Sequence, residues 1–208
     1  MRKYIYTGYI IYSKIIRKLE VFVSKTCTYW LFFLNGVEFK TFKSYGVPFI
    51  KIALSGKLII DENVTLISGK NFNVIGGDTR LNIVVGENAI LQIGKNVGIS
   101  NGTICCRKAI IIEENVLIGG SCKIYDTDFH SKDLINRLNP YINNKPDSDI
   151  KCRTVILKKG VWIGGHSIIL KGVTIGQNSI IGAGSVVSRD IPENEIWAGN
   201  PIKFVAKL

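Results

Sequence analysis

The most constraining feature of the sequence is an aliphatic side chain that recurs at every sixth position of its C-terminal part. The series comprises Leu157, Ile163, Ile169, Ile175, Ile181 and Val187. Four positions after each isoleucine comes a small or β-branched residue: Ser167, Val173, Ser179 and Ser185. A helical period would scatter these positions around a helix, and two-residue alternation would not single them out. The pattern therefore favours a solenoid in which three six-residue units make one triangular coil.

The same frame continues upstream with slips, at Ile60, Val85, Ile93, Ile99, Cys105, Ile112, Ile118 and Ile124. Gly and Asn, which tolerate positive φ, recur where such a coil must turn a corner. We predict an all-β fold, a left-handed parallel β-helix of hexapeptide repeats, over residues 51–198. A right-handed solenoid is the structural alternative, but its repeat is longer and less strictly hexameric.

The frame is interrupted once, at about residues 125–154, by the polar segment YDTDFHSKDLINRLNPYINNKPDSDIKCRT. An excursion of this length inside a compact solenoid is more often functional than accidental. It carries His130, one of two histidines, with Tyr125, Asp126, Asp128 and Phe129 close by in sequence. The alternative is a solvated surface histidine. The other histidine, His166, occupies a corner position and is given no role.

Trp162 occupies the sixth place of its repeat unit, next to the inward-facing Ile163, so its indole is expected to point outward. An exposed tryptophan on a flat wall usually meets a ligand or a neighbouring subunit. The alternative is an aromatic side chain packed beneath the excursion.

Composition limits the partners. The formal charge is +11, but the basic residues are spread along the chain without a nucleic-acid-binding motif, so we expect no nucleic-acid partner. A phosphate-bearing ligand or an anionic membrane-bound substrate accounts for the charge more simply. Five cysteines, without a CxxC pair, predict neither a disulfide framework nor a thiolate metal site, and fit a reducing, cytoplasmic setting.

Residues 1–50 have a different character, with aromatic and aliphatic residues interspersed with Lys and Arg. We expect one or two amphipathic helices that cover the open end of the first coil. A second interpretation is an interfacial segment that brings the protein to the inner face of the cell membrane. No run of apolar residues is long enough to predict a membrane-spanning helix. Residues 199–208 are expected to form a C-terminal tail.

The stretch VWIGGHSIILKGVTIGQNSIIGAGSVVSRDIPENEIWAGNPIKFV, together with ENVLIGGSCKIYDTDFHSKD upstream, resembles the hexapeptide-repeat sugar O-acetyltransferases. This family includes galactoside, maltose, capsular and O-antigen acetyltransferases, and the resemblance covers roughly residues 85–208. It implies acetyl-CoA as the co-substrate and a homotrimer with each active site between two subunits. It also implies His130 as the base and Trp162 near the thioester.

The resemblance further places Gly165 and Ala183 along the pantetheine groove, and Ser188, Arg189 and Lys203 at the nucleotide end of coenzyme A. Asn101, Asp126, Asp128 and Trp162 are the candidate acceptor-binding residues. The chain departs from some relatives at Ala206, where they carry an arginine, and its excursion is longer than in the galactoside enzymes.

The chemistry needs a base for the acceptor and donors for the oxyanion, because a thioester is reactive enough without a covalent enzyme intermediate. Histidine suits the first task. Asp126, Asp128 or a backbone carbonyl could orient the imidazole, and the Gly165 N–H could serve the oxyanion. A cysteine nucleophile is the competing mechanism, but Cys105 and Cys122 fall at inward repeat positions, where a buried thiol is expected.

The sequence thus predicts an acetyl-CoA-dependent O-acetyltransferase acting on a sugar hydroxyl in surface polysaccharide synthesis. The alternatives are a sugar N-acyltransferase and a non-catalytic trimeric scaffold. A carbonic anhydrase on this fold would need three histidine ligands per zinc, so no metal is expected.

Overall fold

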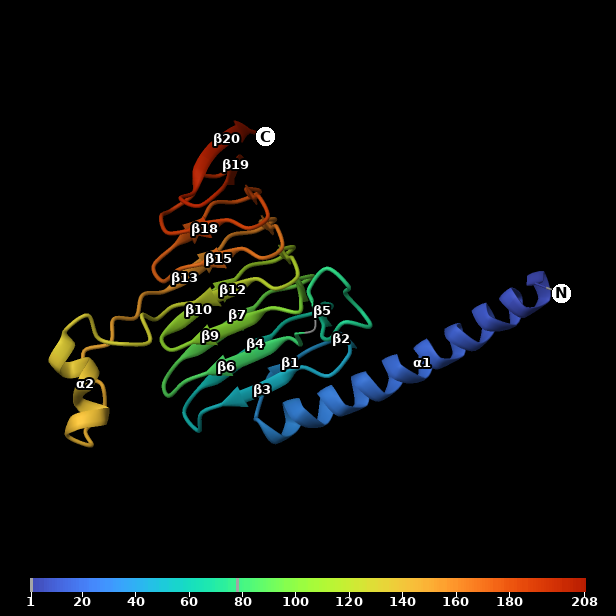
Figure 1. The fold of residues 1–208 in the computed structure, drawn as a ribbon, viewed down its shortest axis with the longest axis horizontal. Coiled ribbons are helices and arrows are strands. Elements are labelled where there is room, and N and C mark those ends of the chain that lie inside the picture. The colour runs from blue at the N-terminus through green and yellow to red at the C-terminus, as the bar shows by residue number, and fades with distance from the viewer. Residues whose placement is uncertain (1, 78) are drawn as a thin grey trace.

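The computed structural model describes residues 2–77 and 79–208 and consists mainly of a triangular prism whose three walls are sheets of mostly parallel strands (Figure 1). The first wall contains β1 (Glu38–Phe39), β4 (Lys57–Ile60), β7 (Ile90–Ile93), β10 (Ala109–Ile112), β13 (Val155–Leu157) and β16 (Thr174–Ile175). The second contains β2 (Phe42–Tyr45), β5 (Val64–Ile67), β8 (Gly98–Ser100), β11 (Leu117–Ile118), β14 (Trp162–Ile163), β17 (Ile180–Ile181), β19 (Glu195–Ala198) and β20 (Lys203–Lys207). The third contains β3 (Phe49–Ile52), β6 (Asn82–Val85), β9 (Thr103–Cys106), β12 (Lys123–Tyr125), β15 (Ile168–Ile169) and β18 (Val186–Val187).

The six-residue period is confirmed by the strand register. On the second wall Ile118 pairs with Ile163, which pairs with Ile181, and on the third wall Ile124 pairs with Ile169, which pairs with Val187. All of these side chains are buried in one continuous core. Each aliphatic position of the repeat therefore stacks on its equivalent in the next coil, which buries apolar surface along the whole prism.

The corner between the first and second walls shows why Asn recurs in the repeat. Asn63, Asn96 and Asn115 adopt φ of 55°, 58° and 60°, a conformation that Asn tolerates better than most residues. Their side chains form a ladder, with Nδ2 of Asn63 2.9 Å from Oδ1 of Asn96, and Nδ2 of Asn96 2.9 Å from Oδ1 of Asn115. Gly160, at φ 72°, interrupts the ladder one coil later.

The solenoid extends beyond the boundaries expected from the sequence. β1, β2 and β3 already form a coil, because they pair with β4, β5 and β6, so the prism begins at Glu38 and not at residue 51. At the other end, residues 199–208 are not a free tail. They turn back at Asn200 and form β20, which pairs antiparallel with β19 at the edge of the second wall.

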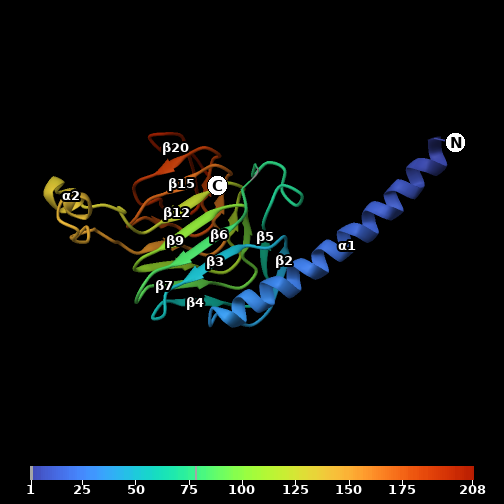
Figure 2. The ribbon, with the colours of Figure 1, turned by 60° about the horizontal axis from the view of Figure 1, so that its bottom comes forward.

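A single long helix, α1 (Arg2–Leu34), precedes the prism, and only its C-terminal third packs against the first coil. Phe32 is buried, the hydroxyl oxygens of Thr28 and Ser44 lie 2.8 Å apart, and the Gly46 N–H donates to the Ser24 hydroxyl at 3.0 Å. The remainder of α1 extends away from the prism (Figure 2). Among the described residues, no helix has the length and apolar character needed to cross a membrane.

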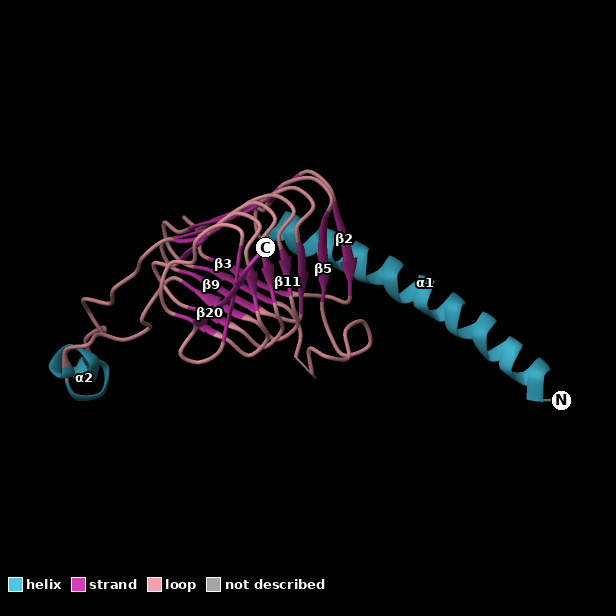
Figure 3. Ribbon diagram, turned by 90° about the horizontal axis from the view of Figure 1, so that it is seen from above, coloured by secondary structure: helices cyan, strands magenta, loops and turns pink. Residues whose placement is uncertain are grey.

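Two segments leave the prism between strands. Residues 126–154, between β12 and β13, contain α2 (Leu134–Ile142) and project from the side opposite to α1 (Figure 3). A second loop, residues 68–81 between β5 and β6, was not expected from the sequence. It is held by Ser121, whose hydroxyl donates to the Gly76 carbonyl at 2.6 Å, and by His166, whose Nε2 lies 3.3 Å from the Ile75 carbonyl oxygen.

Candidate active site

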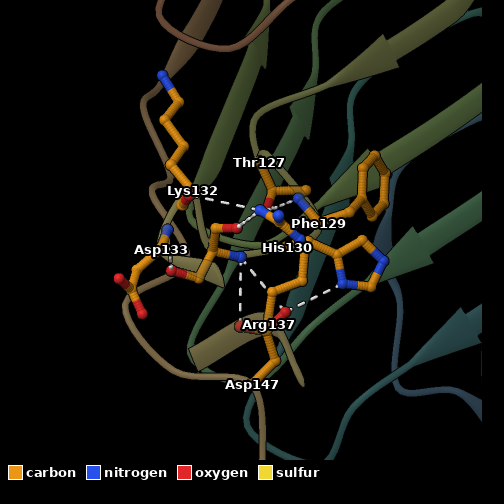
Figure 4. Close-up of polar contacts among 8 residues, drawn as sticks. Thr127, Phe129, His130, Lys132, Asp133, Arg137 and Asp147 are labelled. Carbon is orange, nitrogen blue, oxygen red and sulfur yellow. Dashed lines mark hydrogen bonds and ion pairs between the residues drawn. The ribbon is translucent and has the colours of Figure 1, made fainter. Parts of the chain in front are cut away.

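The excursion presents His130 to solvent on a defined support. Its Nδ1 lies 3.0 Å from Oδ2 of Asp147, and 63% of the His130 side chain is exposed, against 10% for Asp147 (Figure 4). A carboxylate can only accept, so Nδ1 carries the hydrogen of this bond, and Nε2 of the neutral ring keeps a lone pair. The arrangement leaves an oriented, solvent-facing nitrogen that can take a proton.

The local backbone explains the orientation of His130. Phe129 lies at φ 63°, and its N–H donates to the Thr127 hydroxyl at 3.1 Å, which forms a tight turn just before the histidine. After it, the Ser131 N–H donates to Asp147, and Nη1 of Arg137 donates to the Ser131 carbonyl at 2.8 Å (Figure 4). Side chains thus replace the interstrand hydrogen bonds that hold the rest of the prism.

Asp147 was not found by the sequence analysis, which considered Asp126 and Asp128 as partners for the imidazole. It lies seventeen positions after His130, in the irregular segment of the excursion that returns to the prism. The only signal in the sequence is the acidic run KPDSD in a segment that must fold back to β13. That signal does not distinguish Asp147 from Asp149, which pairs with Lys151 in solvent.

Asp126 occupies a structural position at the base of the excursion. It is fully buried, and its carboxylate accepts hydrogen bonds from the backbone N–H groups of Arg107, Lys108 and Ala109, each at 2.7 Å. Both oxygens are therefore engaged within the chain. This geometry gives Asp126 a structural role in the turn between β9 and β10, and its place in acceptor binding stays a prediction.

Two further acceptor candidates, Asp128 and Asn101, are held in different surroundings. Oδ1 of Asp128 pairs with Nζ of Lys171 at 2.8 Å, while its Oδ2 is buried and has no hydrogen-bond partner among the described residues. Asn101 is buried at a different corner, where Oδ1 accepts from the Gly69 N–H at 2.8 Å and Nδ2 donates to the Asn73 carbonyl. Its amide anchors the loop between β5 and β6 through these two bonds, and a contact with an acceptor stays a prediction.

Trp162 lies on the outer face of the second wall, in β14, with 53% of its surface exposed. It pairs with Leu117 of β11, whose side chain is also exposed, and with Ile180 of β17. The indole is therefore not packed beneath the excursion, which leaves the prism from the corner between the third and first walls. Within one chain, Trp162 and His130 belong to different sides of the prism.

The corner between the second and third walls carries a column of small residues that includes Gly120, Gly165 and Ala183. The His166 N–H donates to the Gly120 carbonyl, and the Gly184 N–H donates to the Gly165 carbonyl at 2.9 Å, so successive coils stack closely here. A Cβ atom on Gly165 would lie 3.1 Å from the Gly120 carbonyl oxygen. Small side chains keep the backbone accessible along this edge.

The three residues expected at the nucleotide end of coenzyme A lie at two different corners of the prism. Ser188 and Arg189 are exposed in the turn after β18, at the same corner from which the excursion leaves. Lys203 begins β20 and pairs with Ala198, beside the upper end of the column of small residues. One side of the chain thus carries His130, Ser188 and Arg189, and another carries Trp162, Gly165, Ala183 and Lys203.

Comparisons with known proteins agree with the repeat pattern. Residues 154–189 match the model of the bacterial transferase hexapeptide, six repeats. A Saccharomyces cerevisiae protein that bears the name of an acetyltransferase is 39% identical over 61% of this chain and 57% of its own length. The galactoside O-acetyltransferase of Lactococcus lactis is 35% identical over 60% of this chain and 62% of its own length. Over these stretches the chain is similar to hexapeptide-repeat acetyltransferases.

A solved structure of this family carries its co-substrate. The hexapeptide-repeat acetyltransferase of Vibrio cholerae, in complex with acetyl coenzyme A, is 32% identical to this chain, with a TM-score of 0.50. The likeness covers 57% of this chain and 60% of that one. The chain therefore spans less than two thirds of the relatives described here. The family match is consistent with the left-handed form of the parallel β-helix.

The three buried cysteines, Cys105, Cys106 and Cys122, are poorly suited to nucleophilic chemistry. Burial raises the pKa of Cys106 to about 12, and it also raises the pKa of Cys105 and of Cys122. Cys106 and Cys122 belong to the core, whereas Cys105 is buried outside it, which corrects its expected inward position. A thiolate is the reactive form of cysteine, so these thiols stay inert near neutral pH. Within residues 2–77 and 79–208, no cluster of three His, Cys, Asp or Glu side chains could hold a metal ion.

Proposed function

We propose that this chain transfers the acetyl group of acetyl-CoA to a hydroxyl of a sugar, with His130 as the general base. The observation that carries the proposal is the pairing of the exposed His130 imidazole with the largely buried Asp147. Support comes from the similarity of the chain to a hexapeptide-repeat acetyltransferase and to a galactoside O-acetyltransferase. A non-catalytic scaffold would not need an oriented imidazole at the surface of a long polar excursion.

The reaction follows from the free nitrogen of His130. Nε2 removes the proton of the acceptor hydroxyl while the oxygen attacks the thioester carbonyl carbon. The C–O bond forms, the tetrahedral oxyanion collapses with cleavage of the C–S bond, and the imidazolium returns its proton to the departing thiolate. The Asp147 carboxylate stabilises the imidazolium between these steps. The Gly165 N–H, at an accessible corner, is our candidate donor to the oxyanion.

The division of the candidate residues between two sides of the prism supports a site built by two subunits. We propose a homotrimer in which the excursion of one subunit faces the second wall of its neighbour. His130, Ser188 and Arg189 would then come from one chain, and Trp162, Gly165, Ala183 and Lys203 from the next. The exposed pair of Trp162 and Leu117 is an apolar surface that such an arrangement would cover.

Acetyl transfer itself is tested by incubating the protein with acetyl-CoA and a panel of sugars that includes amino sugars. The reaction is measured by the free thiol of coenzyme A that it releases. Formation of an O-acetyl ester supports the proposal, whereas transfer restricted to amines would replace it with N-acylation. Replacing His130 by Ala should lower turnover by roughly 10²-fold or more, because a general base contributes about 10²–10⁴-fold. Near-normal turnover of this variant would exclude His130 as the base.

The shared site is tested by complementation. Chains with His130→Ala and chains with Trp162→Ala, each of low activity alone, are co-expressed and purified as mixed assemblies. Random mixing should restore about a quarter of the sites, because one interface in four then receives both intact residues. An equal mixture of two tagged His130→Ala chains is the control and should stay inactive. Absence of recovery in the mixed assemblies would place both residues in a site within one subunit.

A further inference from the structure

α1 is amphipathic in an unusual direction, because its apolar face points away from the protein. Ser24, Thr28 and Phe32, which contact the first coil, lie on one side of the helix. At 3.6 residues per turn, Ile15 and Phe22 project from the opposite side. They are 53% and 68% exposed.

The exposed apolar face continues along the whole helix. Between Tyr4 and Leu34 it includes Ile5, Tyr12, Leu19 and Trp30, all of them exposed. Projected on a helical wheel, these positions occupy an arc of about 120°. The face is about 45 Å long, at 1.5 Å per residue. Uncovered apolar surface of this extent marks a site of interaction with another protein or a membrane.

The charges of α1 are arranged along one border of this face. Lys14, Lys18 and Lys25 are exposed and follow one another at its edge, while Glu20 is the one acidic residue of the helix. Arg17 lies on the side towards the prism, with its guanidinium 5.5 Å from the centre of the Phe72 ring. Lysine side chains at such a border can extend their ammonium groups to lipid phosphates while their methylene stems cover apolar surface.

We propose that α1 binds in the plane of an anionic phospholipid membrane, with its apolar face in the boundary between headgroups and acyl chains. A wide apolar arc with aromatic side chains and a basic border fits this surface. Pairing with a second copy fits less well. The apolar seam between two paired helices is narrower than this arc. In such a pair, Glu20 would be the one acidic side chain that each helix has to pair with the lysines of the other.

This inference does not depend on the proposed acetyl transfer, because binding is measured without acetyl-CoA or sugar. The full chain is mixed with vesicles of phosphatidylcholine, or of phosphatidylcholine with a minority of phosphatidylglycerol, and floated through a density gradient. We expect it to float with the vesicles that contain phosphatidylglycerol. Failure to float with them would overturn the proposal.

The variant Ile15→Ser/Leu19→Ser removes two side chains from the centre of the face without altering the contacts with the first coil. Its partitioning onto the anionic vesicles should fall at least about tenfold. The matched control is Leu54→Ser/Val74→Ser, which removes two equally apolar side chains, 102% and 83% exposed, from loops of the prism. It should bind like the unmodified chain, and equal losses in both variants would show non-specific adsorption and overturn the proposal.

A second pair of variants tests the charge. Lys14→Gln/Lys18→Gln/Lys25→Gln should reduce the preference for anionic over neutral vesicles, whereas Lys43→Gln/Lys51→Gln/Lys57→Gln on the three walls should not. The molar mass in solution, measured by sedimentation without vesicles, should be the same for Ile15→Ser/Leu19→Ser and the unmodified chain. A lower mass for that variant would show that the face joins copies of this chain, and would overturn the membrane proposal.

Discussion

Two aspartates at the two ends of the excursion show how differently the prism and the excursion are built. Asp126 is fully buried where the chain leaves β12, and its carboxylate accepts three backbone N–H groups of the turn before β10. Asp147, near the return, holds the exposed imidazole of His130 and the N–H of Ser131. The first carboxylate satisfies the backbone, and the second orients an exposed imidazole, the proposed base.

The contrast extends to the two regions as wholes. In the prism, aliphatic side chains stack in register and the backbone groups pair with the coils on either side. In the excursion, α2 has no buried residue, and side chains such as Arg137 and Asp147 hold the backbone. We infer that stability resides in the prism and that the chemistry resides in the excursion, which contributes little to the core.

The sharpest test of this separation is Asp126→Ala. Three part-buried backbone N–H groups would lose a charged acceptor worth about 1.5–3 kcal/mol per bond, and water would replace part of that loss. We expect the free energy of unfolding, measured by urea denaturation, to fall by about 3–5 kcal/mol. The control is Asp149→Ala, whose carboxylate is exposed and pairs with Lys151 in solvent. It should change stability by less than about 0.5 kcal/mol. Equal effects of the two substitutions would contradict the separation.

A second comparison uses the same residue type in both regions. Ile163 is fully buried in the core, whereas Ile135 of α2 is 73% exposed. Ile163→Ala should lower the free energy of unfolding by about 2–4 kcal/mol, through lost burial and the cavity left behind. Ile135→Ala should leave it within about 0.5 kcal/mol. If Ile135→Ala also destabilises strongly, the excursion packs against something in solution, which the proposed trimer would supply.

The two regions also differ in how far the sequence predicts them. Because each coil stacks on the next, the recurring inward position of the repeat requires an aliphatic side chain. The prism could therefore be predicted from the spacing of Ile163, Ile169 and Ile175. The first coil lacks this spacing, because its strands carry Phe42, Tyr45 and Phe49. Its residues were therefore read as part of an N-terminal segment.

No such constraint acts on the excursion. Its turns depend on contacts between side chains that are separated by a variable number of residues. The sequence therefore indicates His130 but does not identify Asp147 as its partner. The sequence predicts ligand contacts for Asp126 and Asn101 because a polar residue near a loop has the same appearance in sequence whether it binds a ligand or a backbone. Only the backbone N–H groups around Asp126 and the loop around Asn101 separate the two roles.

A third prediction concerns the excursion alone. Asp147→Asn keeps the size of the side chain but removes the charge that stabilises the imidazolium. We expect kcat to fall about thirtyfold with KM for acetyl-CoA unchanged, since a hydrogen bond to a charged group contributes about 1.5–3 kcal/mol. Asp147→Glu should recover part of the loss, and Asp149→Asn serves as the control. A rise in KM without a change in kcat would mean that Asp147 supports binding and not the base.

The smallest expected effect lies on the prism, at the two corners that carry Arg189 and Lys203. In the proposed trimer these side chains come from neighbouring subunits and approach the phosphates of one coenzyme A. Each exposed contact is weak, but phosphates bound by two cations gain charge-assisted hydrogen bonds. Replacing both residues by Ala should raise KM for acetyl-CoA about tenfold with little change in kcat, because contacts far from the carbonyl carbon stabilise ground and transition states alike.

Ionic strength separates this interpretation from an indirect effect on folding. The difference in KM between Arg189→Ala/Lys203→Ala and the unmodified chain should shrink in high salt, where screening already weakens the original contacts. Lys43→Ala/Lys51→Ala, on the second and third walls of the lower coils, is the matched loss of two charges and should leave KM unchanged at any salt concentration. An unchanged KM for Arg189→Ala/Lys203→Ala at low ionic strength would show that the phosphates are bound elsewhere. The excess of basic residues would then have its clearest role along α1, where Lys14, Lys18 and Lys25 border the exposed apolar face.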